Sequence, residues 1–211
     1  MRVLDLTHTI RPAMPVFPGD PQPALSPAST VAQDGFAATL LALHSHTGTH
    51  MDAPAHLFPG KPTLDGLPPE RFIGRGFVLD CRKARGEIGI SALHAAGPAA
   101  AAAEFLLFYT GWAEKWGFPG YFEGFPRLSP ALADSIAAAG KKGVGLDAAS
   151  PDAIEDPALP AHRRLLGRGL VIVENLTNLG ALLGRTFTFC ALPLKYVDAD
   201  GAPVRAAALL D

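Results

Sequence analysis

Twelve consecutive residues hold three histidines and an aspartate, and this density constrains the fold more than any other feature of the chain. The stretch reads Ser45-His46-Thr47-Gly48-Thr49-His50-Met51-Asp52-Ala53-Pro54-Ala55-His56. His46 and His50 have the i, i+4 spacing of one helical face, but Gly48 and Pro54 disfavour a helix there. We therefore expect a tight loop, with His50 and Asp52 pointing the same way where the backbone is extended.

Crowded histidines and carboxylates are costly unless a cation compensates them, and they are the usual ligands of Zn²⁺ and similar divalent ions. His46, His50 and Asp52 lie within seven residues, whereas Ala53-Pro54-Ala55 separates His56 from them. We assign the first three to a metal ion and His56 to acid and base catalysis. The alternative is a closed structural site in a protein without enzymatic activity, because four ligands complete a tetrahedral zinc site.

A second acidic residue, Glu174, lies inside the apolar run Leu170–Leu176. A carboxylate buried in a strand needs a cation or a hydrogen-bonded partner. One of the nearby arginines could pair with it, namely Arg163, Arg164 or Arg168. A second metal pocket that also uses His162 is the other interpretation, and the residues alone leave both open.

The composition favours one globular domain over residues 1–211, since 48% of the residues are hydrophobic and the net charge is −2. No basic footprint for nucleic acid or an anionic membrane is present, so we expect a small-molecule substrate. Cys81 and Cys190 lie in apolar runs and are expected to be free thiols. With no apolar leader after Met1, these features predict a cytoplasmic protein.

Glycine and proline, 22 and 20 residues, are spread along the chain and predict a loop-rich domain with short elements. Helices are expected at Ser91–Ala96, at Pro130–Ala139 behind a Ser129 cap, and at Pro160–Leu166. Strands are expected at residues 2–6, 35–44, 76–81, 104–110, 143–147, 170–176, 187–192 and 204–210. Strands alternating irregularly with short helices predict an α/β domain with a mixed sheet.

A divalent ion in such a site would lower the pKa of a bound water, and the resulting hydroxide can attack a polarised carbonyl. His56, with an ordinary pKa near 6.5, would take the proton and return it to a leaving nitrogen. The same ligand set serves esters and amides alike, so a lactone-opening or lactone-forming activity stays open.

The stretch His46–His56 resembles the H-x-G-T-H-x-D-x-P-x-H signature of the cyclase and bacterial kynurenine formamidase family of metal-dependent hydrolases. Further similar segments span nearly the whole chain: Leu4–Thr7, Pro15–Asp20, Thr110–Trp112, Gly145–Asp147, Val173–Leu176, Leu192–Lys195 and Ala202–Ala206. The resemblance implies a swivelling β/β/α fold, a homodimer or homotetramer, and one or two ions of zinc or manganese. It also implies an amidohydrolase that opens a C–N bond in a formamide or amide.

The resemblance carries roles over to individual positions. His46, His50 and Asp52 match the first metal's ligands, Asp52 bridges to a second ion held by His162 and Glu174, and His56 matches the acid and base. Relatives that act on N-formylkynurenine have Trp where Phe17 stands here. Phe17 keeps an aromatic face for substrate binding but loses the indole donor, so an aromatic or apolar amide is expected, with isatin-like cyclic amides as the alternative.

Overall fold

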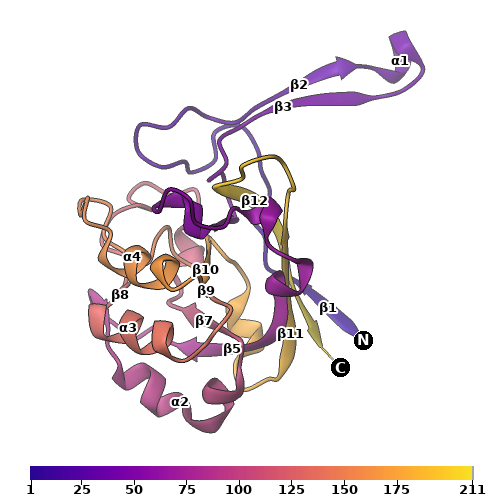
Figure 1. Ribbon diagram of the computed structural model, residues 1–211. Helices are drawn as coiled ribbons and strands as arrows, with labels where there is room; N and C mark the ends of the chain where they lie inside the picture. Colours follow the sequence, from indigo (N-terminus) through magenta and orange to yellow (C-terminus); the bar gives the residue numbers. More distant parts are fainter. Residues whose placement is uncertain (211) are drawn as a thin grey trace.

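A mixed sheet that closes on itself organises the protein, which we describe from a computed structural model covering residues 1–210 (Figure 1). Seven strands lie in the order β12-β11-β5-β7-β9-β10-β4, and β4 pairs again with β12 to complete a barrel. β1 pairs with the C-terminal part of β12, beyond the residues that pair with β4. The strands are β1 (Arg2–Asp5), β4 (His50–Asp52), β5 (Ile73–Asp80), β7 (Phe105–Tyr109), β9 (Gly143–Leu146), β10 (Val171–Glu174), β11 (Phe187–Pro193) and β12 (Gly201–Leu210).

The mixed α/β architecture is confirmed, and the closure of the sheet is a feature that the sequence patterns did not predict. The swivelling arrangement implied by the family resemblance stays a prediction. Strands β5, β7, β9 and β10 pair in parallel, and the remaining pairs of the barrel are antiparallel. Parallel neighbours need crossover connections. Helices α2 (Ser91–Ala102), α3 (Pro130–Ala138) and α4 (Pro160–Gly167) provide them in turn and lie on the same side of these strands (Figure 1).

Strands β7, β9 and β10 are buried on both faces, because their side chains alternate between two hydrophobic clusters. On β7, Phe105 and Leu107 belong to one cluster with residues of β11 and β12, whereas Leu106 and Phe108 pack in the cluster with α3 and α4. This explains why residues 104–110 read as a continuous apolar run.

Local sequence signals predicted where the helices begin and end. The Ser129 hydroxyl accepts from Leu132 N at the start of α3, and Gly140 follows its end with φ of 67°. The helix expected to end at Ala96 continues to Ala102, but Gly97 interrupts it with φ of 66° and ψ of −156°. The backbone thus breaks at the predicted place and resumes a second helical segment.

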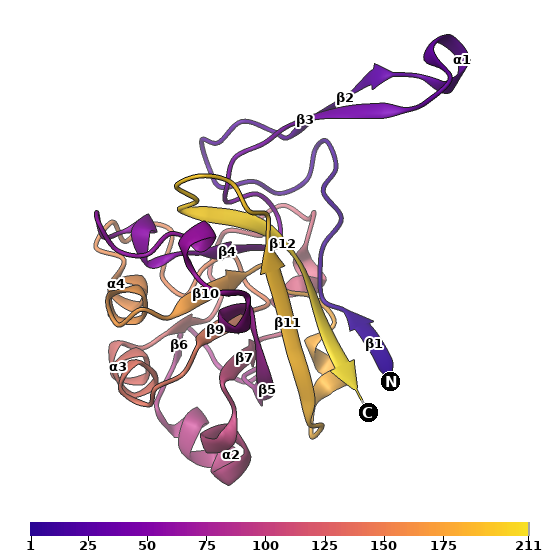
Figure 2. The ribbon, with the colours of Figure 1, turned by 45° about the vertical axis from the view of Figure 1, so that its right-hand side comes forward.

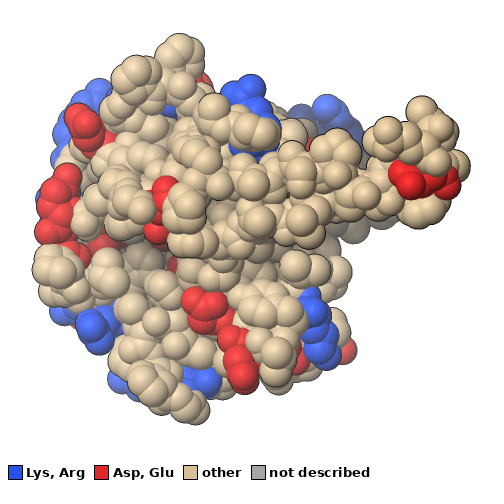
Figure 3. Space-filling view, turned by 90° about the horizontal axis from the view of Figure 1, so that it is seen from above, with Lys and Arg blue, Asp and Glu red and all other residues tan. Residues whose placement is uncertain are grey.

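A hairpin formed by β2 (Ala24–Ser29) and β3 (Ala38–Ala42) projects from the barrel, with the short helix α1 (Val31–Asp34) at its tip (Figures 1 and 2). The strand predicted at residues 35–44 is present, but it lies in this arm and is exposed along its whole length. Leu40 and Leu41 are 62% and 57% exposed. The arm is almost free of charge except at its tip (Figure 3).

The smaller elements complete the chain. Strands β6 (Glu87–Ile88) and β8 (Arg127–Leu128) pair in parallel as a separate two-stranded sheet. The 3-10 turns are η1 (Pro54–His56), η2 (Leu64–Gly66), η3 (Pro69–Phe72), η4 (Trp112–Lys115) and η5 (Leu179–Leu182). Both cysteines are free thiols, as expected. Across residues 1–210, every helix is too short or too polar to cross a membrane.

Candidate metal centre

Strand β4 carries two of the predicted ligands to the seam where the barrel closes. On one side, His50 pairs with Glu174 of β10, and on the other, Asp52 pairs with Gly201 of β12. Because β4 is extended, His50 and Asp52 point the same way, as the sequence predicted. Residues separated by more than a hundred positions in the chain thus meet through sheet register.

Among residues 1–210, three groups of three side chains could each hold a metal ion. One consists of the half-buried His46, His56 and Asp200, and the other two share the carboxylate of Asp52. Of those two, the first is His46, His50 and Asp52: Asp52 Oδ1 lies 2.7 Å from His46 Nδ1 and 3.4 Å from His50 Nε2. The second is Asp52, His162 and Glu174. His162 Nε2 lies 3.6 Å from Asp52 Oδ2 and 3.3 Å from Glu174 Oε1.

Asp52 therefore faces one group with each of its oxygens, which is the arrangement a bridging ligand requires. The five residues predicted as ligands are brought together by the structure. Their role as ligands stays a prediction.

Outer acceptors fix the imidazoles so that one nitrogen of each faces the carboxylates. His50 Nδ1 lies 2.9 Å from the Gly48 carbonyl oxygen, and His162 Nδ1 lies 2.8 Å from Asp152 Oδ2. Each acceptor holds the proton on the bonded nitrogen and leaves the Nε2 lone pair free for an ion.

The chemistry of the donor set fits a divalent cation. Asp52 Oδ2 and Glu174 Oε1 are buried side-chain oxygens without a hydrogen-bond partner, and both belong to the second group. Buried carboxylate oxygens left unpaired are costly, and a cation between them removes that cost. Nitrogen and carboxylate donors together suit zinc, manganese and similar ions; the identity of the metal remains open.

The pKa values reflect the same need for positive charge. Burial and the neighbouring charge of Asp52 raise the pKa of Glu174, because two carboxylates in one dry pocket resist ionising together. Burial lowers the pKa of His46, but hydrogen bonds and charges from Asp52 and Asp200 outweigh it and raise the value to about 9. Without an ion, protons supply the missing positive charge.

His56 is the last residue of the turn η1. It lies beside the two ligand groups that contain Asp52 and belongs to neither of them. Its ring lies 4.2 Å from that of His46, centroid to centroid. Burial lowers the pKa of His56, which favours the neutral form that accepts a proton. His56 belongs to the group formed with His46 and Asp200 and not to the groups around Asp52, so the closed four-ligand site considered above stays an untested alternative.

A cavity of about 260 Å³ opens onto these residues. One wall is apolar, and there Phe17 and Phe122 meet edge to face with centroids 6.5 Å apart. The remaining lining residues are Pro15, Val16, Asp20, His46, Gly48, His50, Asp52, His56, Ala149, Ser150, Leu159, His162, Glu174 and Asn175. The loop containing Phe17, the residue expected to contact substrate, thus forms part of the pocket wall.

Three residues of the site were not identified from the sequence: Asp152, Asp200 and Phe122. Asp152 and Asp200 lie in glycine- and proline-rich turns, where an aspartate ordinarily caps the backbone. A second carboxylate beside the acidic turn residue Asp198 was the only available signal for Asp200. For Phe122 the aromatic richness of residues 116–125 was a signal, although it did not indicate a pocket.

Known proteins resemble this chain in sequence and in fold. Residues 4–153 match the model of the Cyclase family, described as "Putative cyclase". An uncharacterized protein of Methanocaldococcus jannaschii is 35% identical over 214 residues, which cover 100% of both chains. The kynurenine formamidase of Salinibacter ruber is 33% identical over 212 residues, which cover 98% of this chain and 96% of the relative.

Two solved structures extend the comparison. Isatin hydrolase A from Labrenzia aggregata, bound to benzyl benzoate, has a TM-score of 0.89 and 26% identity, covering 99% of this chain and 93% of that one. A structure described as a potential metal-dependent hydrolase with cyclase activity has a TM-score of 0.81 and 27% identity, covering 98% and 96%.

Proposed function

The chain belongs to the cyclase family of metal-dependent hydrolases, and on that premise we propose that it opens a carbon–nitrogen bond in a small amide, formamide or cyclic amide. The observation that carries the proposal is the shared carboxylate of Asp52, with two ligand groups around it and His56 beside the pocket. This combination offers both a cation site and an independent proton carrier.

His46, His50 and Asp52 would hold one divalent ion, and Asp52, His162 and Glu174 would hold a second. A bound ion supplies a Lewis acid that polarises a carbonyl and lowers the pKa of water. His56 accepts the proton of the attacking water and returns it to the leaving nitrogen, since its lowered pKa keeps the ring neutral before the reaction.

The substrate side of the pocket favours an aromatic or apolar group. Phe17 and Phe122 offer two ring faces, and Leu159 adds aliphatic surface on the lining. N-formylkynurenine, isatin and simple aryl formamides all carry an aromatic ring beside a cleavable C–N bond. Isatin-like cyclic amides form the second candidate class, supported by the likeness to isatin hydrolase A.

The test loads the protein with Zn²⁺ or Mn²⁺ and measures hydrolysis of these three substrates. In the His56→Ala variant we expect kcat to fall by about 10²- to 10⁴-fold while the metal content stays that of the wild type. Unchanged turnover of every active substrate would exclude His56 as the proton carrier. If the metal-loaded wild-type protein hydrolyses none of the three substrates, the result contradicts the proposed reaction.

The partner that we propose is a second copy of the chain, as a homodimer or homotetramer. A two-stranded hairpin alone in water is only marginally stable. The arm formed by β2, α1 and β3 is such a hairpin, and Leu40 and Leu41 give it an exposed apolar surface with few charges. Packing against another subunit would bury that surface.

A further inference from the structure

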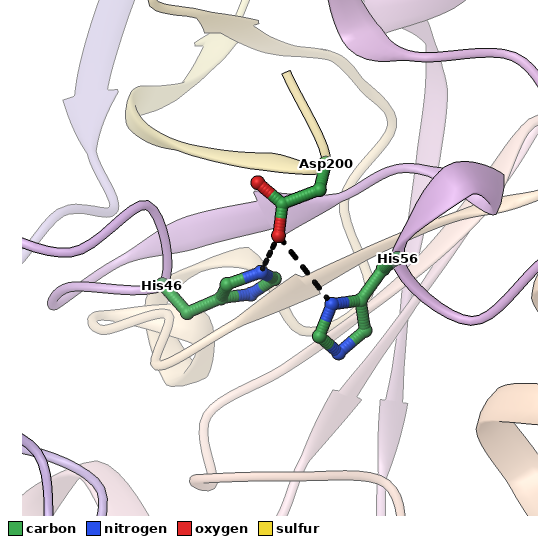
Figure 4. A group of neighbouring side chains, drawn as sticks. All are labelled: His46, His56 and Asp200. Atoms are coloured by element: carbon green, nitrogen blue, oxygen red, sulfur yellow. Dashed lines mark hydrogen bonds and ion pairs between the residues drawn. The ribbon is translucent and has the colours of Figure 1, made fainter. Parts of the chain in front are cut away.

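Asp200 is a carboxylate that the proposed reaction leaves without a role, although it touches the centre of the site. It precedes β12 directly, and Figure 4 shows its Oδ2 aimed at two imidazole rings. The distance from Oδ2 to His46 Nε2 is 3.0 Å, and the distance to His56 Nδ1 is 3.7 Å. One oxygen thus faces both a predicted metal ligand and the predicted proton carrier.

The two nitrogens of His46 face different partners. Nδ1 points inward, 2.7 Å from Asp52 Oδ1, whereas Nε2 points outward to Asp200. A neutral imidazole carries one proton, and that proton lies on whichever nitrogen donates to the better acceptor. If a cation takes the inward position, the proton must be on Nε2, and Asp200 is the group that accepts it.

The other two ligand histidines set a precedent within the same site. His162 and His50 each have one nitrogen bonded to an outer acceptor, Asp152 and the Gly48 carbonyl, and the other turned toward the carboxylates. Asp200 completes this pattern for His46. Outer carboxylates of this kind orient a ligating histidine and raise its basicity.

The position of Gly201 supports the same conclusion. A side chain there would collide with the His46 ring, since a Cβ would lie 2.5 Å from Cε1 and 2.7 Å from Nε2. Asp200 therefore brings a carboxylate acceptor to the His46 ring, and the absence of a side chain at Gly201 leaves room for that ring. The Tyr196 hydroxyl donates its proton to the Gly201 carbonyl oxygen and lies 3.3 Å from Asp200 Oδ1, which fixes the backbone beside the carboxylate.

We propose that Asp200 is a positioning residue that fixes His46 with its proton on Nε2 and its Nδ1 toward the metal, and aligns the His56 ring from the same oxygen. The 3.7 Å separation from His56 is too long for a hydrogen bond and corresponds to an orienting electrostatic contact. Figure 4 shows the second ring nitrogen of His56 on the side away from Asp200, where it remains available for proton transfer. The inference rests on the proposed metal-dependent function.

The first test reads the histidine nitrogens directly. In ¹⁵N-histidine-labelled wild-type protein loaded with Zn²⁺, NMR should show His46 with a protonated Nε2 and a metal-bound Nδ1. A proton on Nδ1 with the metal on Nε2 would overturn the inference. This measurement needs no substrate, so it separates a failure of the positioning role from a failure of the proposed reaction.

The second test compares Asp200→Asn, which keeps the shape and removes the charge, with Asp198→Asn, a matched control in the same loop. Competition with a chelator should show Zn²⁺ affinity about 10- to 100-fold weaker in Asp200→Asn and unchanged in the control. On an active substrate, Asp200→Asn should lower kcat at saturating metal and leave KM near the wild-type value. Melting curves recorded in chelator should coincide for the wild type and Asp198→Asn, and Asp200→Asn should show only the small loss of a partly exposed His46–Asp200 ion pair.

Two results would contradict the role. Wild-type zinc affinity in Asp200→Asn would mean that the charge of Asp200 does not act on His46. The second result is a wild-type protein that binds three zinc ions, one per ligand group, and an Asp200→Asn variant that binds only two. Asp200 would then be a metal ligand together with His46 and His56. If Asp200→Asn does not fold, the NMR result on the wild-type protein decides alone.

Discussion

Replacement of Gly201 by alanine should separate metal binding from folding. An added Cβ would lie 2.5 Å from His46 Cε1, and ordinary contact begins at 3.4 Å, so the ring would have to retreat by about 0.9 Å. The ring has little room, because His56 and His50 lie on it at centroid distances of 4.2 and 5.0 Å. Metal–ligand distances tolerate only about 0.2 Å.

The backbone itself should accept the change. Gly201 opens β12 without a positive φ, and alanine at a compatible position stabilises a protein by about 0.4–1 kcal/mol through the unfolded state. We therefore expect Gly201→Ala to weaken zinc binding by about 10- to 100-fold, or about 1.4–2.7 kcal/mol. The metal-free protein should lose less, because there the displaced ring breaks no metal–ligand bond.

Competition with a chromophoric chelator measures the affinity, and thermal melts in EDTA measure the fold. The matched control is Gly89→Ala, where the nearest atom to the new Cβ is Ser91 Oγ at 3.7 Å. Equal zinc affinity in Gly201→Ala, Gly89→Ala and the wild type would refute the geometry, since it would mean that His46 either moves freely or holds no metal.

Three further outcomes are expected. Zinc affinity should rise between about pH 7 and pH 9, because the pKa of His46 is raised to about 9 without a cation and its proton must leave before Nδ1 can bind metal. Calorimetry in buffers of different ionisation enthalpy measures the released proton. A zinc affinity that does not change with pH would contradict the raised pKa. Chelation should lower the melting temperature by about 5–10 °C relative to zinc at 100 times its Kd, since Asp52 and Glu174 lose their cation, and an unchanged melt would place the metal elsewhere. Leu40→Asp combined with Leu41→Asp should convert oligomers into monomers in light scattering, and a monomeric wild type would disprove a role for the arm in assembly.

Sequence reasoning succeeded where the signal was local. The strand at Phe105–Tyr109 and the helix capped by Ser129 both follow from short-range patterns of burial and capping. The residues predicted as metal ligands also lie together, and the dense histidine stretch and the carboxylate in an apolar strand were the signals that indicated them. Sequence patterns identified the side chains, whereas sheet pairing set the distances between them.

What could not be predicted depends on contacts between distant segments. The strand predicted at residues 35–44 is present but lies in an exposed arm around Leu40 and Leu41, and no local pattern indicates whether such an apolar strand will be buried. Asp200 and Asp152 look like ordinary turn aspartates until the fold brings histidines to them. The closing contact of β4 with β12 involves residues about 150 positions apart, and periodicity carries no information about such a pairing.

The short strand β4 has a consequence for the order in which the molecule assembles. It is three residues long, it is the last member of the ring, and it carries His50 and Asp52. Closing the ring requires loops of more than a hundred residues to form, which is slow and entropically costly. A cation bound by side chains of β4, β10 and α4 would stabilise the closed barrel at this seam. Amide hydrogen exchange at Met51 and its neighbours should therefore be faster in the metal-free protein than in the metal-bound protein.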